Sequence, residues 1–109
     1  MTRIDELVAA IDALQASDLE AWVHEELVVP QQEAGTLVFS DAQCARVRLI
    51  ATLRYDLDIE SESLPVVVSL LDQLYDTRQR LLSLTAAIKQ QDAAVQAAII
   101  AAASDGSGA

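Results

Sequence analysis

One stretch of the chain, residues 36–59, constrains the fold more than any other, because it changes from strand-like to helix-like sequence within a few residues. It opens with the run TLVF, whose β-branched and aromatic side chains are typical of a strand. Ser40 and Gln43 follow as a capping box, which marks the start of a helix. Beyond it, apolar residues recur at spacings of three and four and predict a helix over 41–57.

Two shorter helices are predicted before this stretch. Apolar residues at helical spacing indicate an amphipathic helix over 3–14. Ser17 and Glu20 form another capping box, which predicts a second helix from Ser17 to about Glu26. Pro30 disfavours helical geometry in the residue before it and ends this helix. Helix, short turn, helix, extended wing and helix is the order of a winged helix-turn-helix.

After this domain, assigned to residues 1–60, residues 61–103 are predicted to form one long helix. Apolar residues repeat in it at intervals of seven, with further apolar residues at alternate seam positions, which is a coiled-coil register. The seam consists of Val67, Leu70, Leu74, Leu81, Leu84, Ile88 and Val95. So small a domain cannot bury a stripe of this length, so we expect a homodimer, with its helices parallel or antiparallel. Residues 104–109 are a Gly/Ser tail expected to be disordered.

The charge of the chain is strongly negative and unevenly distributed. The net charge is −10, and residues 1–33 carry one arginine against eight carboxylates, which gives −7. Such a surface repels phosphates and anionic lipids and attracts basic protein partners. The acidic second helix is either an ordinary solvated face or a surface for such a partner. DNA is therefore an unfavourable partner.

The sequence contains no motif that is typical of an enzyme active site. Cys44 is alone and has no identifiable base, and His24 has no second metal ligand near it in sequence. A Gly-rich phosphate loop and a Ser/His/Asp spacing are both lacking. We expect a non-enzymatic protein without cofactor or metal. A single cysteine, the lack of a membrane-spanning apolar run and an acidic N-terminus favour a soluble cytoplasmic protein.

Five strings, in this order and spacing, resemble a known family. They are RIDEL (3–7), ELVVP (26–30), TLVFSD (36–41), ARVRLIATLRYDLDI (45–59) and PVVVSLLDQL (65–74). The first four together resemble the MerR-type winged helix-turn-helix. Within that group, the continuation DLDI (56–59) and PVVVSLLDQL resemble the CbpM-type chaperone modulators. The resemblance implies a mainly all-α fold: a MerR-like winged helix-turn-helix with a small two-strand wing, followed by a long C-terminal coiled-coil helix.

The resemblance also implies a function and a partner. CbpM-type proteins bind the J-domain of a DnaJ-like (CbpA-type) co-chaperone and inhibit its action on Hsp70, and that J-domain carries a basic second helix. Charge and fold together suggest an acidic partner-binding surface on the second predicted helix, complementary to that basic helix. Its candidate residues are Asp18, Glu20, Trp22, Glu25 and Glu26. Trp22 is open to two interpretations, a core residue sharing the apolar stripe or an interface anchor.

The chain departs from the MerR-type pattern at two positions that usually hold glycine. The predicted turn over 13–16 has none, and Glu26 stands where a glycine would allow a left-handed helix end, at a cost of about 1 kcal/mol for glutamate. Two alternatives to the chaperone modulator stay open: a MerR-like DNA-binding transcriptional regulator without an effector domain, and a coiled-coil scaffold whose only partner is itself.

Overall fold

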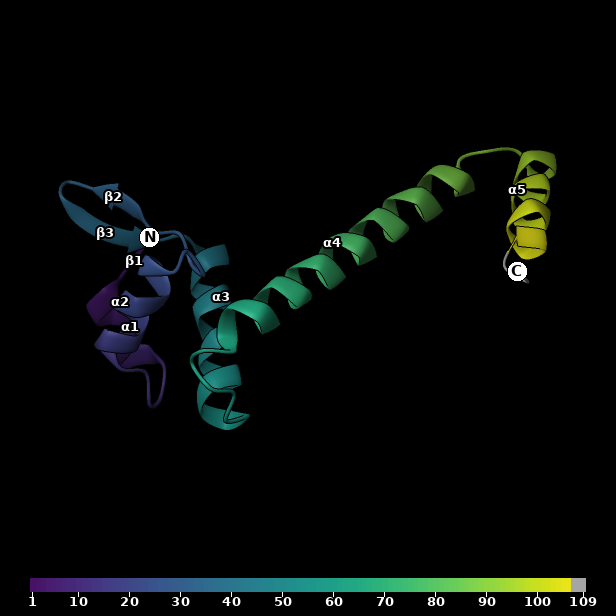
Figure 1. Ribbon diagram of the computed structural model, residues 1–109. Helices are drawn as coiled ribbons and strands as arrows, with labels where there is room; N and C mark the ends of the chain where they lie inside the picture. Colours follow the sequence, from purple (N-terminus) through teal and green to yellow (C-terminus); the bar gives the residue numbers. More distant parts are fainter. Residues whose placement is uncertain (107–109) are drawn as a thin grey trace. The chain divides into compact units, whose positions relative to one another are not determined.

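The computed structural model describes residues 1–106 of the chain (Figure 1). Its elements are β1 (Thr2–Arg3), α1 (Ile4–Ala10), α2 (Ala16–His24), β2 (Gln31–Glu33), β3 (Thr36–Phe39), α3 (Asp41–Ala51), the π-helix η1 (Thr52–Asp56), α4 (Leu64–Lys89) and α5 (Ala93–Gly106). The predicted fold class is confirmed: a mainly helical chain with a small antiparallel sheet and a long helix toward the C-terminus. The chain divides into two compact units, Met1–Leu70 and a second that begins at Leu71.

The sheet has three antiparallel strands in the order β1-β3-β2, one more than the two-strand wing that the sequence predicts. The additional strand is β1, in which Thr2 lies opposite Phe39 of β3. β2 and β3 form the wing, joined by Ala34 and Gly35 with φ angles of 53° and 78°. A two-residue hairpin of this type needs both central residues in the left-handed region, which glycine adopts without strain.

Of the two hydrogen bonds in the capping box predicted for α3, the one accepted by Ser40 is confirmed. The Ser40 hydroxyl accepts a hydrogen bond from the Gln43 backbone N–H at 3.2 Å. The Gln43 side chain does not return to Ser40; its Oε1 accepts from the Val29 N–H at 2.9 Å and ties the loop after α2 to α3. The predicted helix continues through η1, where the Leu57 N–H bonds to the Thr52 carbonyl, five residues back, at 3.0 Å.

The first two helices are shorter than predicted. α1 ends at Ala10, because Ile11 has an extended backbone, and Ala13 then takes a left-handed φ of 65°. Leu14 is buried as the apolar stripe requires, although the turn and not the helix carries it there. The capping box at Ser17 is wrong: α2 begins at Ala16, and the Gln15 carbonyl accepts its first backbone hydrogen bonds. Ser17 therefore lies inside the first turn of α2.

α2 ends at His24, two residues before the predicted end, in a Schellman motif. The Leu27 N–H bonds to the Trp22 carbonyl at 2.9 Å, and the Glu26 N–H bonds to the Val23 carbonyl at 3.1 Å. Glu26 occupies the left-handed position of the motif with a φ of 61°. The geometry usually supplied by glycine is thus retained with glutamate in its place.

Glu26→Gly is therefore expected to raise the free energy of unfolding by about 1 kcal/mol, because glycine adopts positive φ without a Cβ clash. The matched control is Glu25→Gly, which removes the same charge where φ is −81°. Glycine gains nothing there and is expected to lower stability by about 0.5–1 kcal/mol. Urea unfolding measures both, and equal shifts in the two variants would mean that charge, and not backbone strain, decides the outcome.

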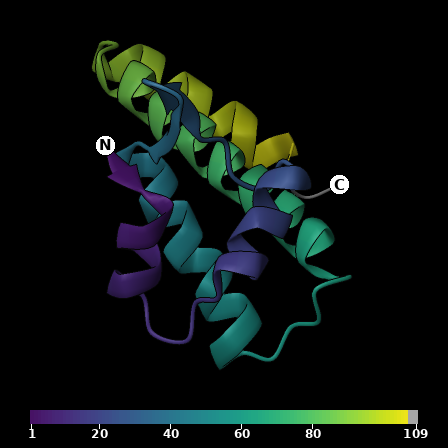
Figure 2. The ribbon, with the colours of Figure 1, turned by 90° about the vertical axis from the view of Figure 1, so that its left-hand side faces the viewer.

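The core of the first unit is formed by α1, α2, β3, α3 and the first turns of α4. α1 and α2 contact each other, and Figure 1 shows α3 on one side of the two helices. Figure 2, turned by 90°, shows α3 behind them and between them. The fully buried large side chains are Phe39, Leu7, Leu19, Ile50, Leu64, Val28 and Val47. Because Leu64 and Val68 are buried, the first compact unit extends beyond the boundary expected after residue 60.

The predicted single helix over 61–103 is interrupted. α4 ends at Lys89 and α5 begins at Ala93. Asp92 acts as the N-cap of α5, because its Oδ1 accepts from the Val95 N–H at 2.9 Å. The Gln96 side chain donates to the Gln91 carbonyl at 2.7 Å, which satisfies an acceptor that the end of α4 leaves open.

The tail expected to be disordered over 104–109 is helical in its first part, because α5 continues to Gly106. The rest of that predicted segment, 107–109, lies outside the described residues.

Candidate protein-interaction surface

Asp18 is held inside the first unit by a contact that the sequence did not predict. The Tyr55 hydroxyl, on η1, donates a hydrogen bond to Asp18 Oδ2 and accepts one from the Gln15 N–H at 3.4 Å. Partial burial and the hydrogen bond to Asp18 both raise the pKa of Tyr55, so the hydroxyl stays protonated as a donor. Asp18 is half-buried, and this hydrogen bond joins α2 to η1.

Trp22 lies in the core. Its side chain is 3% exposed, and its ring packs against that of Tyr55 with centroids 6.3 Å apart and planes at 44°. A tilted pair at this distance is a favourable aromatic contact. Of the two interpretations open for Trp22, the structure therefore places it as a core residue, and we remove it from the candidate partner-binding set.

The remaining candidates, Glu20, Glu25 and Glu26, are exposed, and we call them the acidic surface. Glu20 lies on α2, and the other two follow its last residue, in the C-cap and the Schellman turn. Within residues 1–106 none of the three forms an ion pair. Their charges are therefore free to act on a partner.

The helix-turn-helix and the wing carry no Lys or Arg side chain. Residues 4–45 contain nine Asp and Glu and no Lys or Arg. A recognition helix in the DNA major groove presents Arg or Lys to bases and phosphates, and α2 presents carboxylates instead. The two elements with which a DNA-binding protein of this fold makes its contacts, α2 and the wing, therefore both carry negative charge.

Two of the three arginines on α3 and η1 donate hydrogen bonds within the first unit. Arg46 Nε donates to the Leu27 carbonyl, and Arg54 Nε donates to Ser61 Oγ at 3.2 Å. Both bonds brace loops against α3 and η1. Arg48 is exposed on α3. A single exposed arginine on α3 does not reverse the sign of the surface.

The predicted seam residues lie on two helices. Leu70, Leu74, Leu81 and Leu84 are exposed on α4, with exposed fractions of 58–66%. Val67 and Ile88 are half-buried on the same helix. Val95 lies on α5, beyond the break, and so does not continue the register of α4. Homodimerisation stays a prediction, now carried by α4.

Other kinds of site find no support in the described residues. The part of the chain between 1 and 106 contains no group of three or more His, Cys, Asp or Glu that could hold a metal ion. Cys44 is a free thiol whose Sγ lies 3.7 Å from the Phe39 carbonyl. No helix among these residues is long and apolar enough to cross a membrane.

Two short helices joined by a tight turn, a β-hairpin wing and a following helix define the class: a winged helix-turn-helix protein. A sequence profile of MerR HTH family regulatory proteins matches residues 3–86, and the chain belongs to that family. The proteins of this family are described as regulatory proteins. No significant match was found among the curated proteins or among the solved structures.

Proposed function

We propose that the protein is a chaperone modulator that binds the J-domain of a DnaJ-like (CbpA-type) co-chaperone and inhibits its action on Hsp70. The observation that carries the proposal is the complete lack of Lys and Arg in residues 4–45, beside nine carboxylates. A helix-turn-helix and wing of this charge suit a basic protein surface and not a nucleic acid. The CbpM-type modulators that the chain resembles bind such a basic surface.

The acidic surface supports a role in attracting the partner. Glu20, Glu25 and Glu26 are exposed and have no ion-pair partner within residues 1–106. Exposed charges of this kind raise the association rate and select partners more than they tighten the final complex. A J-domain whose basic helix is covered in this way is unable to present that helix to Hsp70, so inhibition is by competition.

The proposal includes a homodimer formed along α4. Four leucines of this helix are more than half exposed, and an apolar row of that length on a soluble chain marks an interaction surface. A dimer carries two acidic surfaces, so we expect two J-domains for each dimer.

Isothermal titration calorimetry with the J-domain of a co-chaperone from the same host tests the proposal. We expect binding with one J-domain per chain and an association that weakens as salt rises, because exposed charges are screened. Absence of heat at low and at moderate salt, together with no change in light scattering or anisotropy, rules the proposal out.

Charge reversal of the acidic surface is expected to slow association. Glu25→Lys with Glu26→Lys should lower the association rate constant roughly tenfold at low salt, with a smaller effect on dissociation. The control is Glu60→Lys with Glu62→Lys, which makes the same change in net charge at two exposed residues after η1. Stopped-flow measurements compare the two, and equal rates for both variants would place the interface elsewhere.

A DNA-binding regulator is the second candidate, favoured by the family of HTH regulatory proteins to which the chain belongs. It predicts retention on a DNA column at low salt and elution with a steep salt dependence. Flow-through at low salt, with J-domain binding intact, excludes this candidate.

A further inference from the structure

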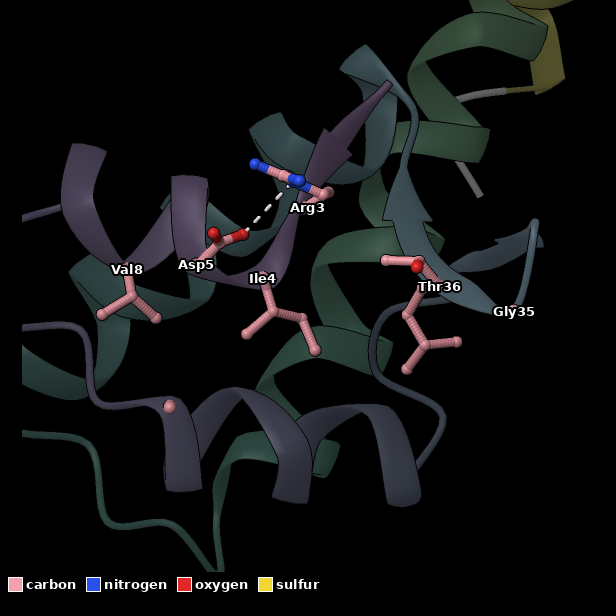
Figure 3. A pocket seen from close by; sticks show the side chains of 8 residues that line it. Arg3, Ile4, Asp5, Val8, Gly35 and Thr36 are labelled. Carbon is pink, nitrogen blue, oxygen red and sulfur yellow. Dashed lines mark ion pairs between the residues drawn. The ribbon is translucent and has the colours of Figure 1, made fainter.

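A groove lies beside the N-terminal end of α2, away from Glu25 and Glu26. It has a volume of about 710 Å³ and is lined by α1, by Ala16 at the start of α2 and by the tip of the wing. Figure 3 shows Ile4 and Val8 on the α1 side and Thr36 on the wing side. Specific sites for small groups fall in the range of about 300–1,000 Å³.

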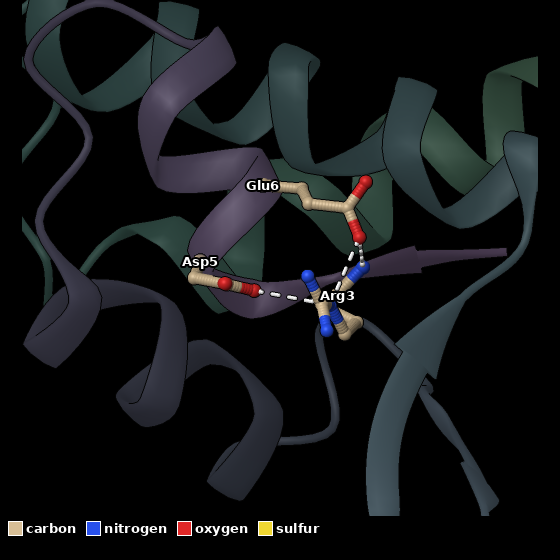
Figure 4. Close-up of polar contacts among 3 residues, drawn as sticks. All are labelled: Arg3, Asp5 and Glu6. Atoms are coloured by element: carbon tan, nitrogen blue, oxygen red, sulfur yellow. Dashed lines mark hydrogen bonds and ion pairs between the residues drawn. The ribbon is translucent and has the colours of Figure 1, made fainter.

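The lining is mainly apolar, and its two charged residues, Arg3 and Asp5, are paired with each other. Ile4, Val8 and Leu37 are only half-buried, although side chains of this kind are stabilised by complete burial. The one cation at the rim is already neutralised, because Arg3 Nε lies 3.5 Å from Asp5 and 3.0 Å from Glu6 (Figure 4). The Arg3 backbone N–H also donates to Glu6, at 3.4 Å, which fixes that arrangement at the start of α1.

We propose that this groove docks a bulky apolar side chain of a basic protein segment, with Ile4, Val8 and Leu37 around the side chain and the carboxylates of α1 beside its Lys or Arg neighbours. Apolar patches with a polar rim are typical of protein-binding sites. Local charge selects the occupant. Arg3 is paired with both Asp5 and Glu6, which leaves a net charge of −1 beside the groove, and residues 1–33 as a whole have a net charge of −7.

Charge favours a basic protein segment over an acidic segment or a nucleic acid as the occupant of the groove. The carboxylates of α1 repel an acidic segment, and they repel the phosphates of a nucleic acid in the same way. Glu25 and Glu26 lie at the other end of α2 from the groove, because Ala16 is the first residue of the helix and Glu25 follows its last. Glu20 is one helical turn after Ala16 and is the member of the acidic surface nearest to Ala16 along α2. The inference does not depend on the J-domain, and any basic amphipathic helix tests it.

The probe is a fluorescein-labelled, lysine-rich helical peptide of about 15 residues with one leucine among its lysines. Two matched peptides replace that leucine with serine or all lysines with glutamate. Ala16→Phe adds a ring at an exposed residue of the groove lining, so we expect the fold to be retained. Ala21→Phe makes the same change at an exposed position of α2 outside the groove.

We expect the peptide to shift the methyl NMR signals of Ile4, Val8 and Leu37 in the full chain. Ala16→Phe and the serine peptide should each raise Kd roughly tenfold, which is 1.4 kcal/mol, while Ala21→Phe changes it by less than about twofold. The glutamate peptide should not bind. Equal binding by the leucine and serine peptides, equal effects of the two phenylalanine variants, or methyl shifts confined to other residues overturn the inference. A failed J-domain titration leaves these results unchanged, so the two proposals fail separately.

Discussion

Replacing Trp22 with alanine is expected to lower the free energy of unfolding by about 3–5 kcal/mol. The side chain is 3% exposed, and its ring packs against Tyr55, whose hydroxyl bonds to Asp18. Its removal leaves a cavity between α2 and η1 and deprives Tyr55 of its aromatic neighbour. Since a domain of this size is stable by only about 5–15 kcal/mol, this is a large fraction of the total. Urea unfolding followed by far-UV circular dichroism measures the change.

The matched control is Glu20→Ala on the same helix, where the side chain is exposed. An exposed substitution of this kind is expected to change the free energy of unfolding by less than about 0.5 kcal/mol. If Trp22→Ala unfolds at the wild-type urea concentration and instead weakens J-domain binding, Trp22 is a contact residue and its assignment to the core is wrong.

Signals that act over a few residues predicted the structure well. The TLVF run forms β3, and Ser40 caps α3 as expected, through a bond to a residue three positions away. The apolar period after it continues as helix through α3 and η1. Each of these elements depends on partners close in the chain, which are visible in one sequence.

Backbone strain was harder to predict, because it is decided by burial nearby. The lack of glycine in the turn after α1 and at Glu26 suggested altered geometry, but Ala13 and Glu26 take left-handed φ angles of 65° and 61°. Each is followed by a buried leucine, Leu14 or Leu27. Burying a leucine side chain gains about 1.5–3 kcal/mol, which exceeds the roughly 1 kcal/mol of strain. The turns therefore form without glycine.

Contacts between residues far apart in the chain could not be predicted, because no spacing in the sequence indicates them. Tyr55 and Asp18 are 37 residues apart, and their hydrogen bond gives a predicted partner-binding carboxylate a contact within the fold. The groove beside Ala16 likewise depends on how α1 and the wing are placed. The break before α5 did have a local signal, the cap residue Asp92, but the heptad spacing continues across it and predicted an unbroken helix.

The MerR-type scaffold and its surface charge thus point to different partners. The fold places α2 and the wing where a DNA reader has its contacts, and residues 4–45 offer only carboxylates there. Bringing these against phosphates is repulsive. Surface charge is independent of the core that maintains the fold, so the same architecture serves a protein partner without change to its buried residues.

Leu74→Glu combined with Leu81→Glu is expected to abolish the proposed homodimer. The two leucines are 66% and 62% exposed on α4 and one heptad apart, so they face the partner helix at equivalent seam positions. Burying four unpaired carboxylates per dimer should raise the dissociation constant at least a hundredfold, or about 3 kcal/mol. Because the side chains are exposed in the single chain, its helix content should be retained. Sedimentation velocity across a range of concentrations measures the change.

The control for this variant is Gln79→Glu with Ala86→Glu, which adds the same charge at two exposed positions, also one heptad apart but outside the seam. It should remain dimeric, because its carboxylates stay in water. A wild-type chain that sediments as a monomer at every concentration contradicts the dimer, and equal dissociation of both variants assigns the effect to net charge. The variant also separates two parts of the proposed function. The monomer should bind a J-domain with an unchanged association rate, because the acidic surface lies in the first unit and the substituted residues lie in the second.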